Sequence, residues 1–222
     1  MFFFPALFVF ILAFLGILVL LFLLIQIGVI SYAFEKIGIS SGYIFLLLLL
    51  SIFGSSINIP LIRFPGEPIV VDEIISYFGL RFRVPVLKSR GEMILAVNVG
   101  GAIIPFMISL YLLIKVDHLF RAFLATLIVA LMTYKLARPI RGMGIAVPLF
   151  IPPLFAAAIS LLLAPNYAPA VAYISGTLGT LIGADLLNLG KIRGLGAPIA
   201  SIGGAGTFDG IFLTGIVAVL LA

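Results

Sequence analysis

Long apolar stretches dominate this chain and limit it to a membrane fold. An α-helix needs about 20 apolar residues to cross the hydrocarbon core of a bilayer. The sequence holds seven such stretches, and we expect spans at 5–32, 42–62, 93–114, 119–134, 144–163, 168–189 and 206–222. Apolar residues are 64% of the chain and charged residues 9%, whereas a soluble domain is about half apolar and a quarter charged. We therefore predict an all-α polytopic bundle that forms one integral membrane domain over residues 1–222.

One long connection interrupts this pattern between the second and third spans. Residues 63–92 are rich in charged side chains, yet 69–71 and 77–84 are strand-like, the latter with apolar residues at every second position. The apolar content is too high for a disordered linker. We expect a small β-hairpin or an amphipathic interfacial segment here, inserted between two spans.

The distribution of Lys and Arg predicts the orientation in the membrane. With seven spans, ten of the 13 basic residues fall on one side: Arg63, Arg81, Arg83, Lys88, Arg90, Lys135, Arg138, Arg141, Lys191 and Arg193. Cytoplasmic loops carry an excess of Lys and Arg. We expect a multi-pass protein of the cell membrane with the loop 63–92 and the amino terminus in the cytoplasm and the carboxyl terminus outside.

The composition also excludes several chemistries. The chain has no Cys and one His, which excludes disulfides and thiolate zinc sites and makes a multi-His metal site or a Ser-His triad improbable. We expect no cofactor. The net charge of +5 reports membrane orientation rather than a nucleic-acid partner. The expected partners are the lipid bilayer and either a membrane-embedded peptide or a small solute.

Two acidic residues lie inside expected spans. Asp185 belongs to the sixth span and Asp209 to the seventh, whereas the other six acids lie in loops or at span edges. An ionisable residue in a span costs about 2.5–3.5 kcal/mol on the insertion scale and marks a functional site by default. We interpret this pair as the candidate catalytic residues.

Two asparagines lie at the same expected depth as the acids. Asn58, Asn98, Asp185 and Asp209 each fall within six residues of the predicted cytoplasmic boundary, which is within about 10 Å at 1.5 Å per residue. We therefore expect these four side chains to surround one polar layer near that face. Asn188 follows Asp185 by three residues and shares its helical face. The candidate substrate-binding residues are Asn58, Asn98, Asn188 and Thr207.

Several short strings resemble a known prokaryotic family. The strings at 55–60, 98–102, 183–188 and 203–210 (SSINIP, NVGGA, GADLLN and GGAGTFDG) are similar to those of the membrane family known as domain of unknown function 1614. The resemblance covers most of the chain. It implies a multi-pass membrane protein and brings no established activity.

A second, more remote resemblance concerns the acids. Intramembrane aspartyl proteases of the presenilin and prepilin-peptidase type carry two Asp on neighbouring spans, one of them in a Gly-x-Gly-Asp motif. Gly206 matches the first glycine of that motif before Asp209, while Phe208 replaces the second; Gly183 precedes Asp185 by two residues. This resemblance implies an intramembrane diaspartyl hydrolase, in which one carboxylate activates water and a protonated partner polarises the scissile carbonyl.

Two other functions use the same residues. Glycines and prolines flank the polar strings at 54–60, 98–105 and 201–206, as in the broken helices of transporters, so a proton- or sodium-coupled small-solute transporter is an alternative. Small residues and amides also pack helices together. A membrane scaffold without catalytic activity is therefore the third possibility.

Overall fold

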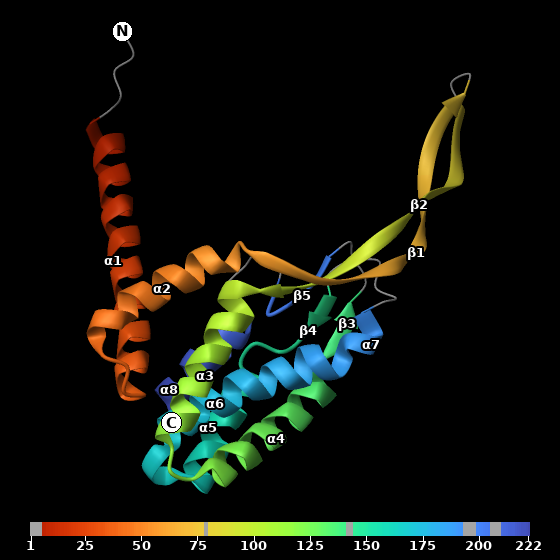
Figure 1. Ribbon diagram of the computed structural model, residues 1–222. Helices are drawn as coiled ribbons and strands as arrows, with labels where there is room; N and C mark the ends of the chain where they lie inside the picture. Colours follow the sequence, from red (N-terminus) through yellow and green to blue (C-terminus); the bar gives the residue numbers. More distant parts are fainter. Residues whose placement is uncertain (1–5, 78–79, 141–143, 193–198, 205–209) are drawn as a thin grey trace.

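The computed structural model shows a bundle of helices with the strands gathered at one of its ends (Figure 1). It describes residues 6–77, 80–140, 144–192, 199–204 and 210–222. The α-helices are α1 (Ala6–Lys36), α2 (Ser41–Ser55), α3 (Ile104–Lys115), α4 (Leu119–Leu136), α5 (Ile151–Leu163), α6 (Ala168–Thr180), α7 (Leu189–Ile192) and α8 (Gly210–Leu221). Proline occupies the first turn of α3, α5 and α6, where no helical partner is needed for the missing N–H.

Shorter helical turns extend two of these helices. The π-helical turn η1 (Val99–Ile103) precedes α3, and the π-helical turn η3 (Leu181–Asp185) continues α6 into the 3₁₀ turn η4 (Leu186–Asn188) and α7. A further 3₁₀ turn, η2 (Pro165–Tyr167), precedes α6. Among the described residues, three helical segments are long and apolar enough to cross a membrane: Ile11–Lys36, Leu119–Leu136 and Pro165–Lys191. The described apolar helices therefore support a membrane protein, while α2, α5, α8 and the segment from η1 to α3 are shorter.

Three expected spans are shorter because strands take part of each. The second span ends as a helix at Ser55, and the third begins as a helix only at Val99. The segments missing from these two spans pair with each other in strands β1 (Asn58–Tyr77) and β2 (Leu80–Asn98). The fifth span begins at Ile151, because Gly144–Ala146 forms β4 and pairs with β3 (Arg138–Ile140). Our prediction that helix occupies all of 42–62, 93–114 and 144–163 was wrong.

The predicted hairpin is present and is longer than expected. β1 and β2 pair antiparallel from Asn58–Asn98 at the base to Tyr77–Leu80 near the tip, and the hairpin extends away from the helices (Figure 1). The strand-like stretch expected over 77–84 is divided between the two strands, because β1 ends at Tyr77 and β2 begins at Leu80. A third strand, β5 (Ile199–Ile202), adds to β2 in parallel, so that the sheet order is β1-β2-β5.

The described core has a large apolar cluster that joins α1, α2, α3, α4, α6 and α8, and a smaller one that includes Leu95 and Ile202 of the sheet. The fully buried rings of Phe34, Tyr173 and Phe212 come from α1, α6 and α8, with centroids 6.5 Å (Phe34–Tyr173) and 6.4 Å (Phe34–Phe212) apart. Lys36 Nζ also donates to the carbonyl of Val219 at 3.1 Å. The end of α1 is thereby fixed to α8, while its apolar side chains from Ile11 to Ile27 remain largely exposed to the surroundings.

Candidate functional site

Two predicted polar residues form the base of the hairpin. Asn58 and Asn98 are register partners, and the Asn98 amide nitrogen donates to Asn58 Oδ1 at 3.1 Å and to the Ser55 carbonyl at 2.6 Å. Asn98 Oδ1 accepts from the Gly101 N–H at 2.7 Å. Asn98 is fully buried and caps η1, since its oxygen satisfies an N–H that has no partner within the helix.

The turn η1 sits directly against the end of α2. A side chain at Gly100 would overlap the Ser51 carbonyl oxygen and the Ser55 backbone nitrogen. Only glycine allows these two backbones to approach so closely. The Val99 N–H donates to the Ile57 carbonyl at 3.0 Å. This hydrogen bond joins the polar string at 55–60 to the one at 98–102.

Strand β5 adds a residue that the sequence did not indicate. Ser201 Oγ donates to Asn58 Oδ1 across the sheet. The turn after β5 has Gly203 at φ +81° and Gly204 at φ +88°, with the Gly204 N–H bonded to the Ser201 carbonyl at 3.2 Å. A Cβ at Gly203 would lie 2.5 Å from the Ala102 Cβ, so this turn packs on η1.

The same turn reaches Asp185. The Gly203 N–H donates to Asp185 Oδ2 at 2.8 Å, and the Asp185 side chain is half-buried at the end of η3. Gly203 therefore lies between the two π-helical turns, packed on η1 and hydrogen-bonded to η3. The structure thus connects Asn58, Asn98 and Asp185 through one short strand and its glycine turn.

Asn188 stabilises the irregular backbone after α6. Its amide nitrogen donates to the carbonyls of Gly183 and Ala184 at 2.9 and 3.0 Å. Its Oδ1 is buried and has no hydrogen-bond partner among the described residues, and the same holds for Thr133 Oγ1 on α4. A Cβ at Gly183 would lie 2.9 Å from the Thr133 Cβ, so both unpartnered oxygens belong to residues that contact Gly183. Buried oxygens of this kind suit a bound water or cation.

Two candidate residues lie outside this picture. Asp209 and Thr207 fall outside the described residues, so the expected pairing of Asp185 with Asp209 stays a prediction. Within the described part of the chain, no group of three or more His, Cys, Asp or Glu is arranged to hold a metal ion.

The arrangement places a carboxylate beside the terminal described strand of the sheet. Among the described strands β5 is terminal, and a terminal strand is the position at which an extended peptide can add to a sheet. Asp185 is bonded to Gly203, the first residue after that strand. A peptide paired with β5 would therefore have its backbone next to a group able to accept a proton.

The family comparison covers the site. A family model described as "Protein of unknown function (DUF1614)" matches residues 52–221, which include every candidate residue named above. No curated protein and no solved structure matches the chain.

Proposed function

Because the chain belongs to the family described as "Protein of unknown function (DUF1614)", its function must be inferred from its own side chains, and we propose an intramembrane diaspartyl hydrolase that cleaves membrane-embedded peptides. The observation that carries this proposal is the Asp185 carboxylate held by Gly203 at the end of the terminal strand β5. It joins a proton acceptor to a surface that can hold an extended backbone.

The hydrogen bond to Asp185 suits the role of general base. Accepting the Gly203 N–H fixes the orientation of the Asp185 carboxylate, so Asp185 is the member of the pair assigned to accept a proton. Asp209, placed three residues into the last expected span, is assigned the role of the protonated acid. Two neighbouring carboxyl groups share one proton because both cannot ionise cheaply.

The proposed reaction is the addition of water to a peptide carbonyl. Asp185 takes a proton from water as the water oxygen bonds to the carbonyl carbon, and Asp209 gives its proton to the carbonyl oxygen. The tetrahedral intermediate then collapses: the C–N bond breaks, the leaving nitrogen takes the proton held by Asp185, and the new hydroxyl returns a proton to Asp209. Both carboxyl groups end in their starting states.

The asparagines have different parts in this proposal. Asn98 uses its oxygen and both amide hydrogens within the protein, which favours a positioning role. Asn58 accepts two hydrogen bonds through Oδ1, while its amide nitrogen makes none in the described part of the chain and its side chain is half-buried. Asn58 is therefore the better candidate to donate to a substrate carbonyl.

The test is cleavage of a reporter peptide in liposomes. Asp185→Asn and Asp209→Asn keep the side-chain size and remove the titratable proton, so each is expected to lower turnover by about 10²–10⁴-fold. Asp117→Asn is the matched control, because Asp117 is exposed and its carboxylate binds the Tyr167 hydroxyl at 2.6 Å, away from the sheet. Unchanged cleavage in both site variants, with the parent active, would eliminate the diaspartyl mechanism.

A proton- or sodium-coupled transporter is the second candidate, favoured by one specific observation. Thr133 Oγ1 and Asn188 Oδ1 are buried beside the π-helical turn η3 and have no partner in the part of the chain that the structure describes. Oxygens at an interrupted helix are the ligands that transporters offer to ions. Under this proposal Thr133→Val abolishes ion-gradient-driven flux. Neither the parent nor the variant cleaves peptides. Flux that is equal in Thr133→Val and the parent would reject it.

A further inference from the structure

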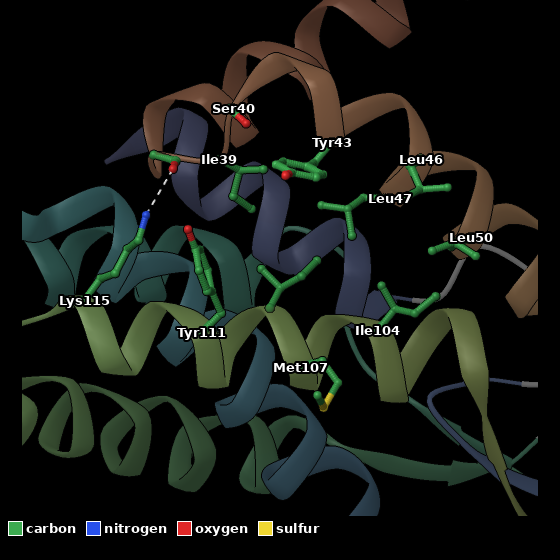
Figure 2. A pocket seen from close by; sticks show the side chains of 12 residues that line it. Ile39, Ser40, Tyr43, Leu46, Leu47, Leu50, Ile104, Met107, Tyr111 and Lys115 are labelled. Atoms are coloured by element: carbon green, nitrogen blue, oxygen red, sulfur yellow. Dashed lines mark hydrogen bonds between the residues drawn. The ribbon is translucent and has the colours of Figure 1, made fainter.

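A second site lies at the end of the bundle opposite the sheet. A groove of about 800 Å³ runs between α2 and α3 (Figure 2), within the range of about 300–1,000 Å³ that ligand pockets occupy. Its walls are mostly apolar side chains of the two helices. They include Tyr43, Leu46, Leu47 and Leu50 of α2 and Ile104 and Met107 of α3. The groove shares no residue with the sheet end and is independent of the function proposed above.

The groove is polar at one end and apolar along the rest. Figure 2 shows Lys115, Tyr111 and Ser40 gathered at one end, while Leu50 and Ile104 lie at the other. Lys115 Nζ lies 3.4 Å from the Gly38 carbonyl and 4.5 Å from the centre of the Tyr111 ring. One charged end and a long apolar wall match the shape of a lipid, whose headgroup and acyl chain differ in the same way.

The charge of Lys115 is not neutralised within the described part of the chain. Its recorded contacts are a carbonyl and an aromatic ring, neither of which carries a negative charge. The nearest acid along the chain is Asp117, which is bonded to the Tyr167 hydroxyl. The first turn of α2, which begins at Ser41, adds partial positive charge at the same end.

We propose that this groove binds an anionic phospholipid, with the phosphate on Lys115 and one acyl chain between α2 and α3. The apolar wall selects a chain-bearing ligand over free phosphate, because phosphate alone would leave the apolar surface exposed. The ammonium selects an anionic headgroup over a zwitterionic one. A basic side chain near an anionic lipid contributes about 1 kcal/mol, which corresponds to a preference of about fivefold.

The test exploits the absence of Trp from the chain. Tyr43→Trp places a single fluorophore in the groove, and Phe120→Trp places one on α4 outside it, also near the helix start and exposed. Each full-length variant is reconstituted in nanodiscs that contain phosphatidylglycerol or phosphatidylcholine with brominated acyl chains. We expect brominated phosphatidylglycerol to quench Tyr43→Trp with about fivefold higher apparent affinity, and the two lipids to quench Phe120→Trp equally.

Charge variants identify the residue responsible. Lys115→Gln in the Tyr43→Trp background is expected to remove the preference for phosphatidylglycerol, whereas Arg121→Gln, an exposed cation at the same end of the bundle that does not line the groove, is expected to keep it. Soluble glycerol phosphate should not compete. The proposal is overturned if the two lipids quench Tyr43→Trp equally, if the preference survives Lys115→Gln, if glycerol phosphate competes, or if no lipid quenches because a second copy fills the groove.

Discussion

The two π-helical turns of this protein are built alike and differ in how their asparagines are paired. In η1 a side chain at Gly100 would overlap the backbone of α2, and in η3 a side chain at Gly183 would overlap the Ala130 carbonyl of α4. Asn98, before η1, uses its oxygen and both amide hydrogens. Asn188, after η3, uses only its hydrogens, and its buried oxygen has no partner within the described ranges.

The difference distinguishes η1, a structural support, from η3, a candidate functional site. A π-helical turn frees backbone groups from the regular helix, and such turns are frequent at functional positions. Around Asn98 the freed groups are bound by protein atoms, which suits a rigid support for the hairpin. Around Asn188, three residues after the half-buried Asp185, one oxygen is left without a partner among the described residues. Ser51, beside η1, also has a hydroxyl without a partner among the described residues. The distinction between η1 and η3 therefore rests on the two asparagines alone.

The largest expected effect is common to both turns. Gly100→Ala and Gly183→Ala force a methyl group into the backbone of a neighbouring helix, and we expect each to lower the free energy of unfolding by about 3 kcal/mol or more. Gly16→Ala, on the exposed face of α1 with nothing near its Cβ position, should change it little. Thermal melting in detergent measures all three. Equal stability of the Gly100 and Gly183 variants with the control would mean that the helices are not in close contact.

An intermediate effect should distinguish the two asparagines. Asn98→Leu leaves the Ser55 carbonyl and the Gly101 N–H without partners, and we expect a loss of about 2 kcal/mol. Asn188→Leu loses two donated bonds and also removes an unpaired buried oxygen, so we expect a loss of about 1 kcal/mol or less. Denaturant titration of the two variants compares them directly. Equal losses of unfolding free energy in the two variants would remove the distinction between the structural support at η1 and the candidate site at η3.

The smallest expected effect concerns two threonines of α4. Thr126 Oγ1 donates to the Ala122 carbonyl at 2.8 Å, while Thr133 Oγ1, two turns later, is buried without a partner. We expect Thr126→Val to destabilise by about 0.6 kcal/mol and Thr133→Val to be neutral or stabilising, because valine removes an unpaired polar group of the same size. A clear loss of stability in Thr133→Val would indicate that its hydroxyl binds a water or an ion.

The sequence predicted which polar strings meet more accurately than it predicted helix lengths. Asn58 and Asn98 were expected at one level, and they are register partners joined by a hydrogen bond. The sequence predicts helix for the strand ends around them, because a short apolar run has no periodicity that distinguishes a strand from a buried helix. Ile59 to Ile62 and Met93 to Val97 are such runs.

The third strand could not be predicted from local pattern. β5 has four residues, and its partner on β2 is about a hundred positions earlier in the chain. Only the glycine pair after it gave a signal, since residues at positive φ end a strand with a turn. Ser201 and the Gly203 N–H were missed for this reason, although they connect the asparagines to Asp185.

The unequal helix lengths have a consequence for the surrounding lipid. α1 has 31 residues and would be about 46 Å long, whereas α5 and α8 have 13 and 12 residues and reach only about 20 Å. A hydrocarbon core is about 30 Å thick. If α5 and α8 cross it as the sequence predicts, their lengths would create a hydrophobic mismatch, which a bilayer meets by becoming thinner around short helices.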